Sequence, residues 1–113
     1  MREIKFRAWD SISKEIHGWD KIKHIPLVDF ELEHYTIEQF TGLKDKNGKE
    51  IYEGDILKSE TNHYYEVVWQ DYFWGIKELF FGTTGIKYNT HLRFEIIGNI
   101  YQNPELITNN FAD

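Results

Sequence analysis

Five histidines are the first residues of this chain whose chemistry could support catalysis or metal binding. They are His17, His24, His34, His63 and His91. None belongs to a His-x-x-x-His or His-x-His pair, and the chain has no cysteine, so the spacings typical of zinc sites do not occur. A hydrolytic site would require His34 or His91 to meet a carboxylate through space, as catalytic pairs do. The spacing favours histidines without a catalytic role, and a histidine–carboxylate enzyme remains the alternative.

Three carboxylates close together in the sequence, Glu50, Glu53 and Asp55, could act on phosphoryl groups with a divalent ion. Turn geometry explains them without a metal, and their spacing does not match a calcium-binding loop. The chain contains no GxxxxGK[ST] or GxGxxG phosphate loop and no Gly-x-Ser-x-Gly nucleophile elbow. We therefore predict no catalytic residue, no metal site and no cofactor, and classify the protein as a non-enzyme.

The turn around Asn47-Gly48 is the most specific local signal. A two-residue Asn47-Gly48 loop would place Lys46 opposite Lys49, and like charges directly opposite each other destabilise a hairpin. A three-residue loop, Lys46-Asn47-Gly48, instead places Asp45 opposite Lys49. Asp45 and Gly48 then occupy the preferred first and fourth positions of a type I turn, with Gly48 in the left-handed conformation. We predict the three-residue loop.

The same register predicts the elements on both sides of this loop. It pairs Lys44 with Glu50 and Leu43 with Ile51. Gly54 follows at the third position of a type II turn, where a positive φ is required. A new strand should begin directly after this second turn.

Aromatic residues make up 17% of the chain, which is the outlier of its composition. Many of them fall in residues 72–81. This segment has too many large aromatic side chains for both faces of a strand to be solvated. We predict that this segment is central core or a subunit interface. It has a single lysine between residues 64 and 81, so a surface that stacks nucleic-acid bases would lack its usual basic groove. The predicted interface residues are Tyr72, Phe73, Trp74, Phe80 and Phe81.

Charge argues against nucleic acid and membrane as partners. The net charge is −6, from 19 acidic and 13 basic residues, which opposes attraction to phosphate backbones or anionic lipid. The one modest basic row, Arg2, Lys5 and Arg7, is expected on the solvated face of a strand over residues 3–8. No signal peptide and no apolar run of the ~20 residues that span a bilayer is present, so we expect a cytoplasmic protein.

The elements that must position these residues are short strands separated by glycine turns. We expect strands at 28–40, 56–58 and 64–69, a turn flanked by Gly82 and Gly85, and a last strand with a bulge at Gly98. Residues 11–24 are expected to form a loop or a short element. The pattern predicts one domain over 1–113: a mainly β, small antiparallel partial barrel or sandwich with long loops and little helix.

Three segments carry a resemblance to a known family. They are Thr41–Leu57 (TGLKDKNGKEIYEGDIL), Met1–Asp10 (MREIKFRAWD) and Phe94–Leu106 (FEIIGNIYQNPEL). In combination they resemble the YopX family of phage and prophage proteins. The resemblance implies a cytoplasmic phage or prophage protein, a homo-oligomer, and no established activity or catalytic residues. Our leading hypothesis is a non-enzymatic, homo-oligomeric interaction protein with a host or phage protein partner. The alternatives are a nucleic-acid-associated accessory protein and a metal-dependent enzyme.

Overall fold

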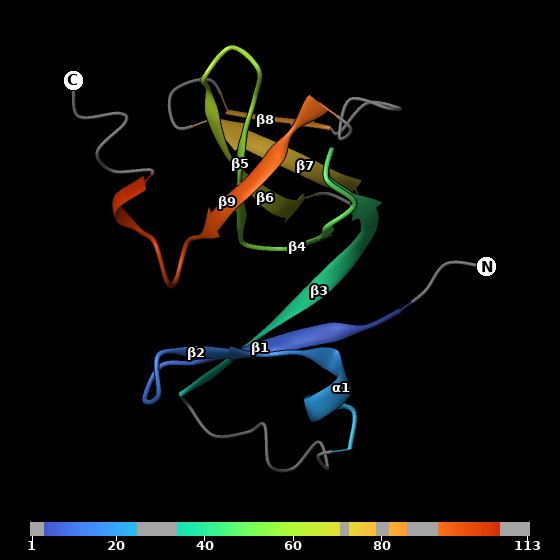
Figure 1. Ribbon diagram of the computed structural model, residues 1–113, viewed down its shortest axis with the longest axis vertical. Helices are drawn as coiled ribbons and strands as arrows, with labels where there is room; N and C mark the ends of the chain where they lie inside the picture. Colours follow the sequence, from blue (N-terminus) through green and yellow to red (C-terminus); the bar gives the residue numbers. More distant parts are fainter. Residues whose placement is uncertain (1–3, 25–33, 71–72, 79–81, 86–92, 107–113) are drawn as a thin grey trace.

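Two antiparallel sheets and a short helix form the fold of this protein (Figure 1). The computed structural model describes residues 4–24, 34–70, 73–78, 82–85 and 93–106. One sheet has the strand order β2-β1-β3-β4 and the other has the order β8-β7-β6-β5-β9. The elements are β1 (Phe6–Asp10), β2 (Glu15–His17), α1 (Trp19–Ile22), β3 (Tyr35–Lys44), β4 (Glu50–Tyr52), β5 (Asp55–Lys58), β6 (Tyr64–Gln70), β7 (Phe73–Glu78), β8 (Gly82–Gly85) and β9 (Glu95–Asn99).

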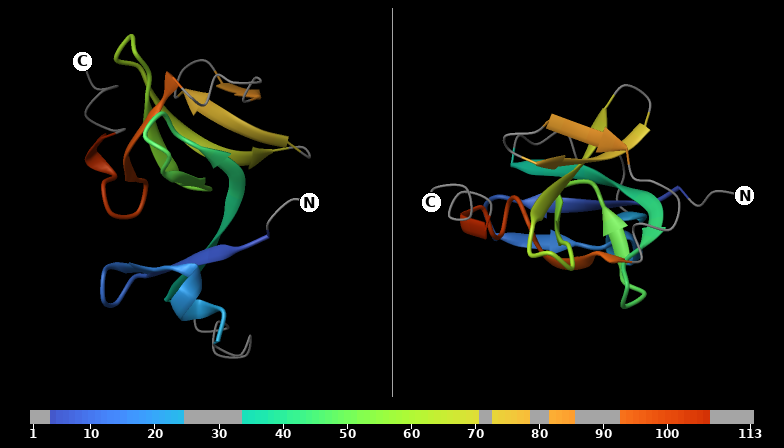
Figure 2. Two further views of the ribbon diagram at one scale, coloured as in Figure 1. Left: turned by 45° about the vertical axis from the view of Figure 1, so that its right-hand side comes forward. Right: turned by 90° about the horizontal axis from the view of Figure 1, so that it is seen from above.

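The long strand β3 connects the two halves of the molecule. Its first part pairs with β1, from Asp10 opposite Tyr35 to Phe6 opposite Gln39, and its last part pairs with β4. The register with β4 shifts between Phe40 and Lys44. In Figure 1 and in the left view of Figure 2, β3 runs from its pairing with β1 toward the five-stranded sheet. Side chains of β1, β3 and the β4–β5 turn can therefore meet between the sheets.

The main core lies against the five-stranded sheet, which is curled (Figure 2). Burying apolar side chains of this size stabilises a fold by roughly 1.5–3 kcal/mol each. Partly buried side chains extend the cluster, with Tyr65 packing edge-on against Phe94 at a ring separation of 5.6 Å. The cluster consists of Ile51, Leu57, Val67, Trp74 and Phe94.

The mainly β, antiparallel prediction is confirmed. The predicted hairpin is also confirmed, because the Asp45 N–H donates to the Lys49 carbonyl (2.8 Å) and the Gly48 N–H donates to the Asp45 carbonyl (3.0 Å). Gly48 has φ +81° and Gly54 has φ +86°, as their turns require.

The register of the hairpin strands is confirmed in part. Lys44 lies opposite Glu50 as predicted, although the Glu50 carboxylate forms its ion pair with Lys5. The predicted Leu43–Ile51 pair falls in the stretch where the β3–β4 register shifts.

The prediction for the first strand is partly wrong. β1 is a strand, but Ile4, which was expected to face the core, is exposed. Arg7, which was expected in solvent, has only 13% of its side-chain surface exposed. The cause is that the β4–β5 turn covers the face of β1 that was expected to be wet. Asp55 and the Glu53 carbonyl on this turn both contact Arg7.

The prediction for Gly82 and Gly85 is wrong, because they do not flank a turn but begin and end strand β8, which pairs with β7. A Cβ on Gly85 would lie 3.5 Å from the Phe73 ring, which is an ordinary van der Waals contact across the β7–β8 pair, so this contact does not require a glycine.

Three other predicted segments are resolved by the structure. Residues 11–24 contain β2 and the single-turn helix α1. The strand expected at 28–40 is present from Tyr35 and continues to Lys44, while residues 28–33 lie outside the described part. The register of β5 with β9 shifts where Ile56 faces Gly98, so the predicted bulge is confirmed.

Candidate functional site: an acidic pocket between the sheets

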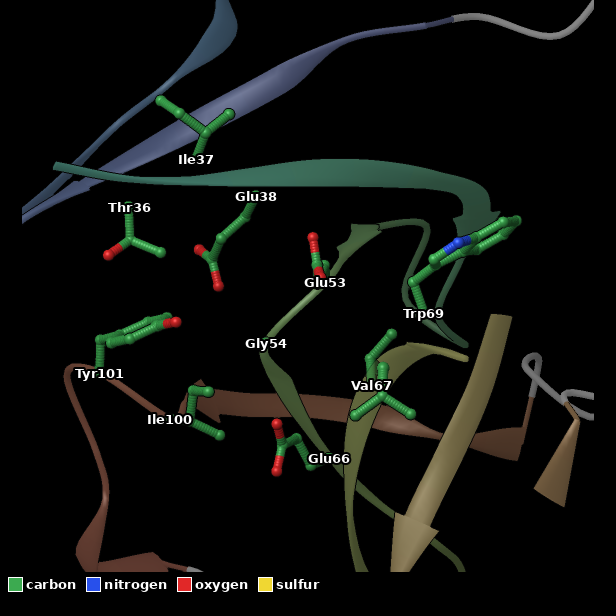
Figure 3. Close-up of a pocket in the computed structure, with 11 residues that line it drawn as sticks. Thr36, Ile37, Glu38, Glu53, Gly54, Glu66, Val67, Trp69, Ile100 and Tyr101 are labelled. Atoms are coloured by element: carbon green, nitrogen blue, oxygen red, sulfur yellow. The ribbon is translucent and has the colours of Figure 1, made fainter. Parts of the chain in front are cut away.

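A pocket of about 230 Å³ lies between β3 and the five-stranded sheet, and three carboxylates line it (Figure 3). Glu38 comes from β3, Glu53 from the β4–β5 turn and Glu66 from β6. Gly54, Trp69 and Tyr101 also line the pocket. We call this cavity the acidic pocket.

Glu38 is the innermost carboxylate of the acidic pocket, with 2% of its surface exposed. Its Oε1 accepts a hydrogen bond from Arg7 Nε at 2.9 Å. Its Oε2 has no hydrogen-bond partner among the described residues. In Figure 3 the side chain points from β3 toward Gly54 and Tyr101. A buried polar atom without a partner is costly. This oxygen is an unmet acceptor at the inner wall of the pocket, where it lies against Gly54 in the space that a Cβ at position 54 would take.

Arg7 joins the acidic pocket to the rest of the fold. Its guanidinium donates from Nη2 to Asp55 Oδ1 at 2.6 Å and to the Glu53 carbonyl at 3.4 Å, and it lies 4.7 Å from the centre of the Tyr52 ring. Asp55 Oδ2 in turn accepts the Tyr52 N–H at 2.7 Å. One buried cation thus holds carboxylates from β3 and β5 together, and it uses only one oxygen of Glu38.

The electrostatics of the acidic pocket favour positive charge. Burial raises the pKa of Glu38 to about 7; Arg7 opposes this effect, while Asp55 and Glu53 reinforce it. Burial likewise raises the pKa of Glu66, against the attraction of Lys77. Burial and the charges of Glu38, Glu53 and Glu66 raise the pKa of Tyr101. Each of these shifts reflects a carboxylate-rich site in which another negative charge is unfavourable.

A single metal ion does not fit this donor set. Within the described segments, no group of three or more His, Cys, Asp or Glu side chains is close enough together to hold one. The carboxylates of the acidic pocket therefore surround a space instead of converging on a point. Such an arrangement suits a cationic group with several spread donors.

The residues predicted to form turns have structural roles, and one of them also lines the acidic pocket. Asp45 is buried, and its Oδ1 accepts the N–H groups of Asn47 and Lys49, both at 2.9 Å. Its Oδ2 accepts the Ile96 N–H at 3.0 Å, which ties the hairpin to β9. Gly54 lines the acidic pocket, a role that turn chemistry did not indicate.

The predicted interface residues lie in different environments. Trp74 is buried in the chain's own core, with its ring 4.9 Å from that of Trp69 in an edge-on contact. Phe73 is 40% exposed. The other predicted interface residues, Tyr72, Phe80 and Phe81, lie outside the described residues.

None of the four histidines in the described segments lines the acidic pocket. His17 Nε2 lies 3.5 Å from Asp10 Oδ2, and the His34 ring lies 4.2 Å from the Tyr35 ring. His24 and His63 are exposed, and His91 lies outside the described part. Of the three carboxylates close together in the sequence, Glu53 lines the acidic pocket, whereas Glu50 pairs with Lys5 and Asp55 pairs with Arg7.

The fold and the pocket define a small two-sheet β protein with a carboxylate-lined cavity, and comparison with known proteins places it in a family. The family model described as "YopX protein" matches residues 21–108. The chain is 32% identical to protein EF1440 from Enterococcus faecalis, whose crystal structure it matches with a TM-score of 0.64 over 95% of this chain and 99% of that one. This chain belongs to the YopX family.

A second solved structure shares the fold. Protein yopX from Bacillus subtilis is 24% identical and gives a TM-score of 0.63, over 94% of this chain and 98% of that chain. No significant match was found among functionally curated proteins. None of the helices in the described segments has the length and apolar character needed to cross a bilayer.

Proposed function

We propose that this YopX-family protein is a non-enzymatic interaction protein that holds a positively charged group of a partner protein in the acidic pocket. The observation that carries the proposal is the buried Glu38 Oε2, which has no partner among the described residues and shares the pocket with Glu53 and Glu66. Leaving such an acceptor unmet costs roughly 1–3 kcal/mol, and a bound cation would remove this cost.

The chemistry of the lining supports binding more than catalysis. A carboxylic acid with a pKa near 7, such as Glu38, is suited to proton transfer, and such groups are frequent in active sites. Proton transfer in catalysis needs a reacting group held beside it. The other carboxylates of the pocket lining are Glu53 and Glu66, whose negative charges attract a cation and do not activate a nucleophile.

Self-association is a second candidate function, supported by exposed aromatic surface. Trp69, at the acidic pocket, is 47% exposed, and Phe73, four residues further along the same strand pair, is 40% exposed. Large aromatic residues carry much of the binding energy of interfaces. Size exclusion with light scattering tests this proposal: we expect an oligomer at micromolar concentration that Trp69→Ser weakens, and a monomeric wild-type protein would contradict it.

Nucleic-acid binding has less support than it had from the sequence. Two members of the basic row on the first strand are engaged internally, since Lys5 pairs with Glu50 and Arg7 pairs with Glu38 and Asp55. Affinity for phosphate backbones requires free, clustered cations. Anisotropy titration with duplex DNA at ~150 mM salt, where the Debye length is about 8 Å, should show no sub-micromolar binding.

The cellular setting is proposed from the family resemblance. We propose a phage or prophage origin and a cytoplasmic location, in which the partner would be a host or phage protein. The acidic composition of the chain, with net charge −6, is compatible with a partner that presents basic residues.

Binding of small cationic probes tests the function itself. The C-terminal amides of Nα-acetyl-lysine and Nα-acetyl-arginine, titrated at millimolar concentration, should shift the NMR signals of Glu66 and Tyr101. Glu66→Gln should weaken the effect several-fold. Glu60→Gln, at an exposed turn position outside the pocket lining, is the matched control and should behave as wild type. If neither probe shifts these signals, the acidic pocket is not a cation site and the proposal fails.

A further inference from the structure

We infer that the acidic pocket is a guanidinium site that takes the side chain of an arginine on a partner protein. The inference rests on the proposed function and names the chemical group that the pocket selects. The arrangement of acceptors, a guanidinium already present beside the pocket and the aromatic residues of the lining all favour this group.

Arg7 shows how this cluster holds a guanidinium. Its Nε binds Glu38 Oε1, its Nη2 binds Asp55, and its planar group lies 4.7 Å from the centre of the Tyr52 ring. The other side of the same carboxylate presents the same kinds of group. Glu38 Oε2 is the acceptor without a partner, Glu66 is a second carboxylate of the lining, and Tyr101 supplies an aromatic ring.

The carboxylates are spread around the pocket, and this arrangement favours a guanidinium, whose donors are spread in a plane, over a compact ammonium. A guanidinium carries five N–H donors in one plane, whereas an ammonium concentrates three donors on one atom. The carboxylates do not converge closely enough for a metal ion, so a compact ammonium would also leave part of the set without a donor. A guanidinium that bonds Glu38 Oε2 still has donors directed toward Glu53 and Glu66.

Burial and aromatic contact favour the same group. A guanidinium is more weakly hydrated than an ammonium, so it is transferred into a partly closed cavity at lower cost. It also stacks on aromatic rings. Tyr101 and Trp69 line the acidic pocket, and both rings are held by other aromatics. Tyr101 is stacked on Trp9 at 5.9 Å, and Trp69 contacts Trp74 edge-on.

The size of the pocket and the exposure of its rim favour a side chain over a larger free ligand. A volume of about 230 Å³ holds one long side chain with little more. Trp69 is half exposed, so a partner backbone can run along it while one side chain reaches Glu38. Free arginine would bring its own α-carboxylate toward three glutamates, which is unfavourable.

The affinity of the acidic pocket for a guanidinium should increase as the pH rises. The charged and titratable groups that face Glu38 are Arg7, Asp55, Glu53 and Tyr101, with Glu66 across the pocket and Lys77 opposite Glu66 on β7. Of these, Glu38 is the group that changes charge near neutrality. Protonation of Oε2 converts the acceptor into a donor and removes its attraction for a guanidinium.

Calorimetric titration with capped amino acids separates this inference from the function on which it rests. The probes are the N-acetyl amides of arginine, lysine and citrulline, with free arginine as a fourth ligand, all at pH 8. We expect the capped arginine to bind at least tenfold more tightly than the capped lysine. Its uncharged isostere citrulline should not bind measurably, and free arginine should bind more weakly than the capped form.

The outcomes distinguish the two claims. Equal or tighter binding of lysine would overturn the guanidinium inference and leave the proposed cation-binding function intact. Binding of neither, or equal binding of citrulline, would overturn both. Tighter binding of free arginine than of the capped form would overturn the assignment to a partner protein's side chain.

Variants and pH complete the test. For capped arginine, Glu66→Gln should weaken binding at least fivefold, Glu60→Gln should leave it unchanged, and lowering the pH from 8 to 5.5 should weaken it several-fold. Affinity that does not depend on pH, or that Glu66→Gln does not alter, would exclude the geometry proposed here.

Discussion

The carboxylate of Glu38 occupies the space beside Gly54 in which the Cβ of any other residue would have to lie. Gly54 meets two requirements at once, because its φ of +86° also suits the turn between β4 and β5. The acidic pocket can therefore extend inward to a buried carboxylate only because position 54 has no side chain.

Replacing Gly54 by alanine should destabilise the protein more than the same change at Gly48. Both glycines have positive φ, so both variants carry backbone strain of roughly 1–3 kcal/mol. A Cβ at position 48 meets open space, whereas a Cβ at position 54 overlaps Glu38. We expect Gly54→Ala to cost about 1–3 kcal/mol more in urea unfolding, as for overpacked sites. Equal costs would show that the overlap is relieved without strain.

Substitution of Gly48 itself tests the hairpin. Gly48→Val should lower the free energy of unfolding by on the order of 1–2 kcal/mol, through left-handed strain on a β-branched residue. Gly48→Asn should cost less, because asparagine tolerates this conformation. Thermal unfolding compares the two variants, and an unchanged melting temperature for Gly48→Val would contradict the assignment.

Removal of the Asp45 carboxylate should destabilise the protein and change its response to acid. Asp45→Ala leaves the N–H groups of Asn47, Lys49 and Ile96 without their acceptor, at a cost of roughly 2–4 kcal/mol. Burial alone would raise the pKa of Asp45, but hydrogen bonds from these three N–H groups outweigh it and hold the pKa below its usual value.

The sign of the Asp45 effect follows from that lowered pKa. The stabilisation by the Asp45 carboxylate is fully present above pH ~4 and is lost as the pH falls through the native pKa of Asp45. The free energy of unfolding of wild type should therefore fall more below pH ~4 than that of Asp45→Asn. Lys46→Ala is the control: its side chain forms an exposed ion pair with Glu95 and should contribute less than about 1 kcal/mol. Parallel acid profiles for wild type and Asp45→Asn would contradict the assignment.

Glu38 should make the protein less stable as the pH rises toward neutrality. Burial raises the native pKa of Glu38 to about 7, above the unfolded value, so the native state binds more protons between pH ~4.5 and ~7. The free energy of unfolding should fall across this window, by on the order of 3 kcal/mol if no other group compensates. Glu38→Gln should flatten the profile, and an unchanged slope in that variant would refute the assignment.

Loss of the Arg7 cation should be more harmful than loss of the cation on Lys5. Arg7→Met leaves Glu38 and Asp55 buried without their common partner, which should cost about 3–5 kcal/mol. Lys5→Met removes a partner of Glu50, whose carboxylate is partly exposed, and should cost about 1 kcal/mol or less. Comparable losses of unfolding free energy in the two variants, measured by denaturant unfolding, would show that the Arg7 network contributes no more to stability than the Lys5–Glu50 ion pair.

Local turn chemistry was readable from the sequence because its causes lie within a few residues. The charges of Lys46 and Lys49 exclude the two-residue loop, and the glycines at 48 and 54 mark the required positive φ. Strands β5 and β6 were also predicted, since each lies between turn residues and β6 alternates apolar side chains. These features depend on near neighbours, which one sequence contains.

The acidic pocket was not readable because its parts meet only through the tertiary fold. Arg7 has the spacing of a solvated strand residue, and Glu38 follows several other acidic residues in the sequence. Nothing local distinguishes them from surface charges. Their burial depends on the β4–β5 turn lying against β1, and the role of Tyr101 depends on the turn after β9. Pairing between such distant segments cannot be derived from composition or periodicity.

The two sets of bonds made by Asp45 have a consequence for the order of folding. Its bonds to Asn47 and Lys49 close over a few residues, so the hairpin can form within microseconds, early in folding. Its bond to Ile96 spans 51 positions and must wait until β9 has docked on β5. Contacts of such long separation slow the search for the native state. The Asp45 carboxylate would therefore first stabilise the early hairpin. Later, through its bond to Ile96, it would stabilise β9 once that strand has docked on β5.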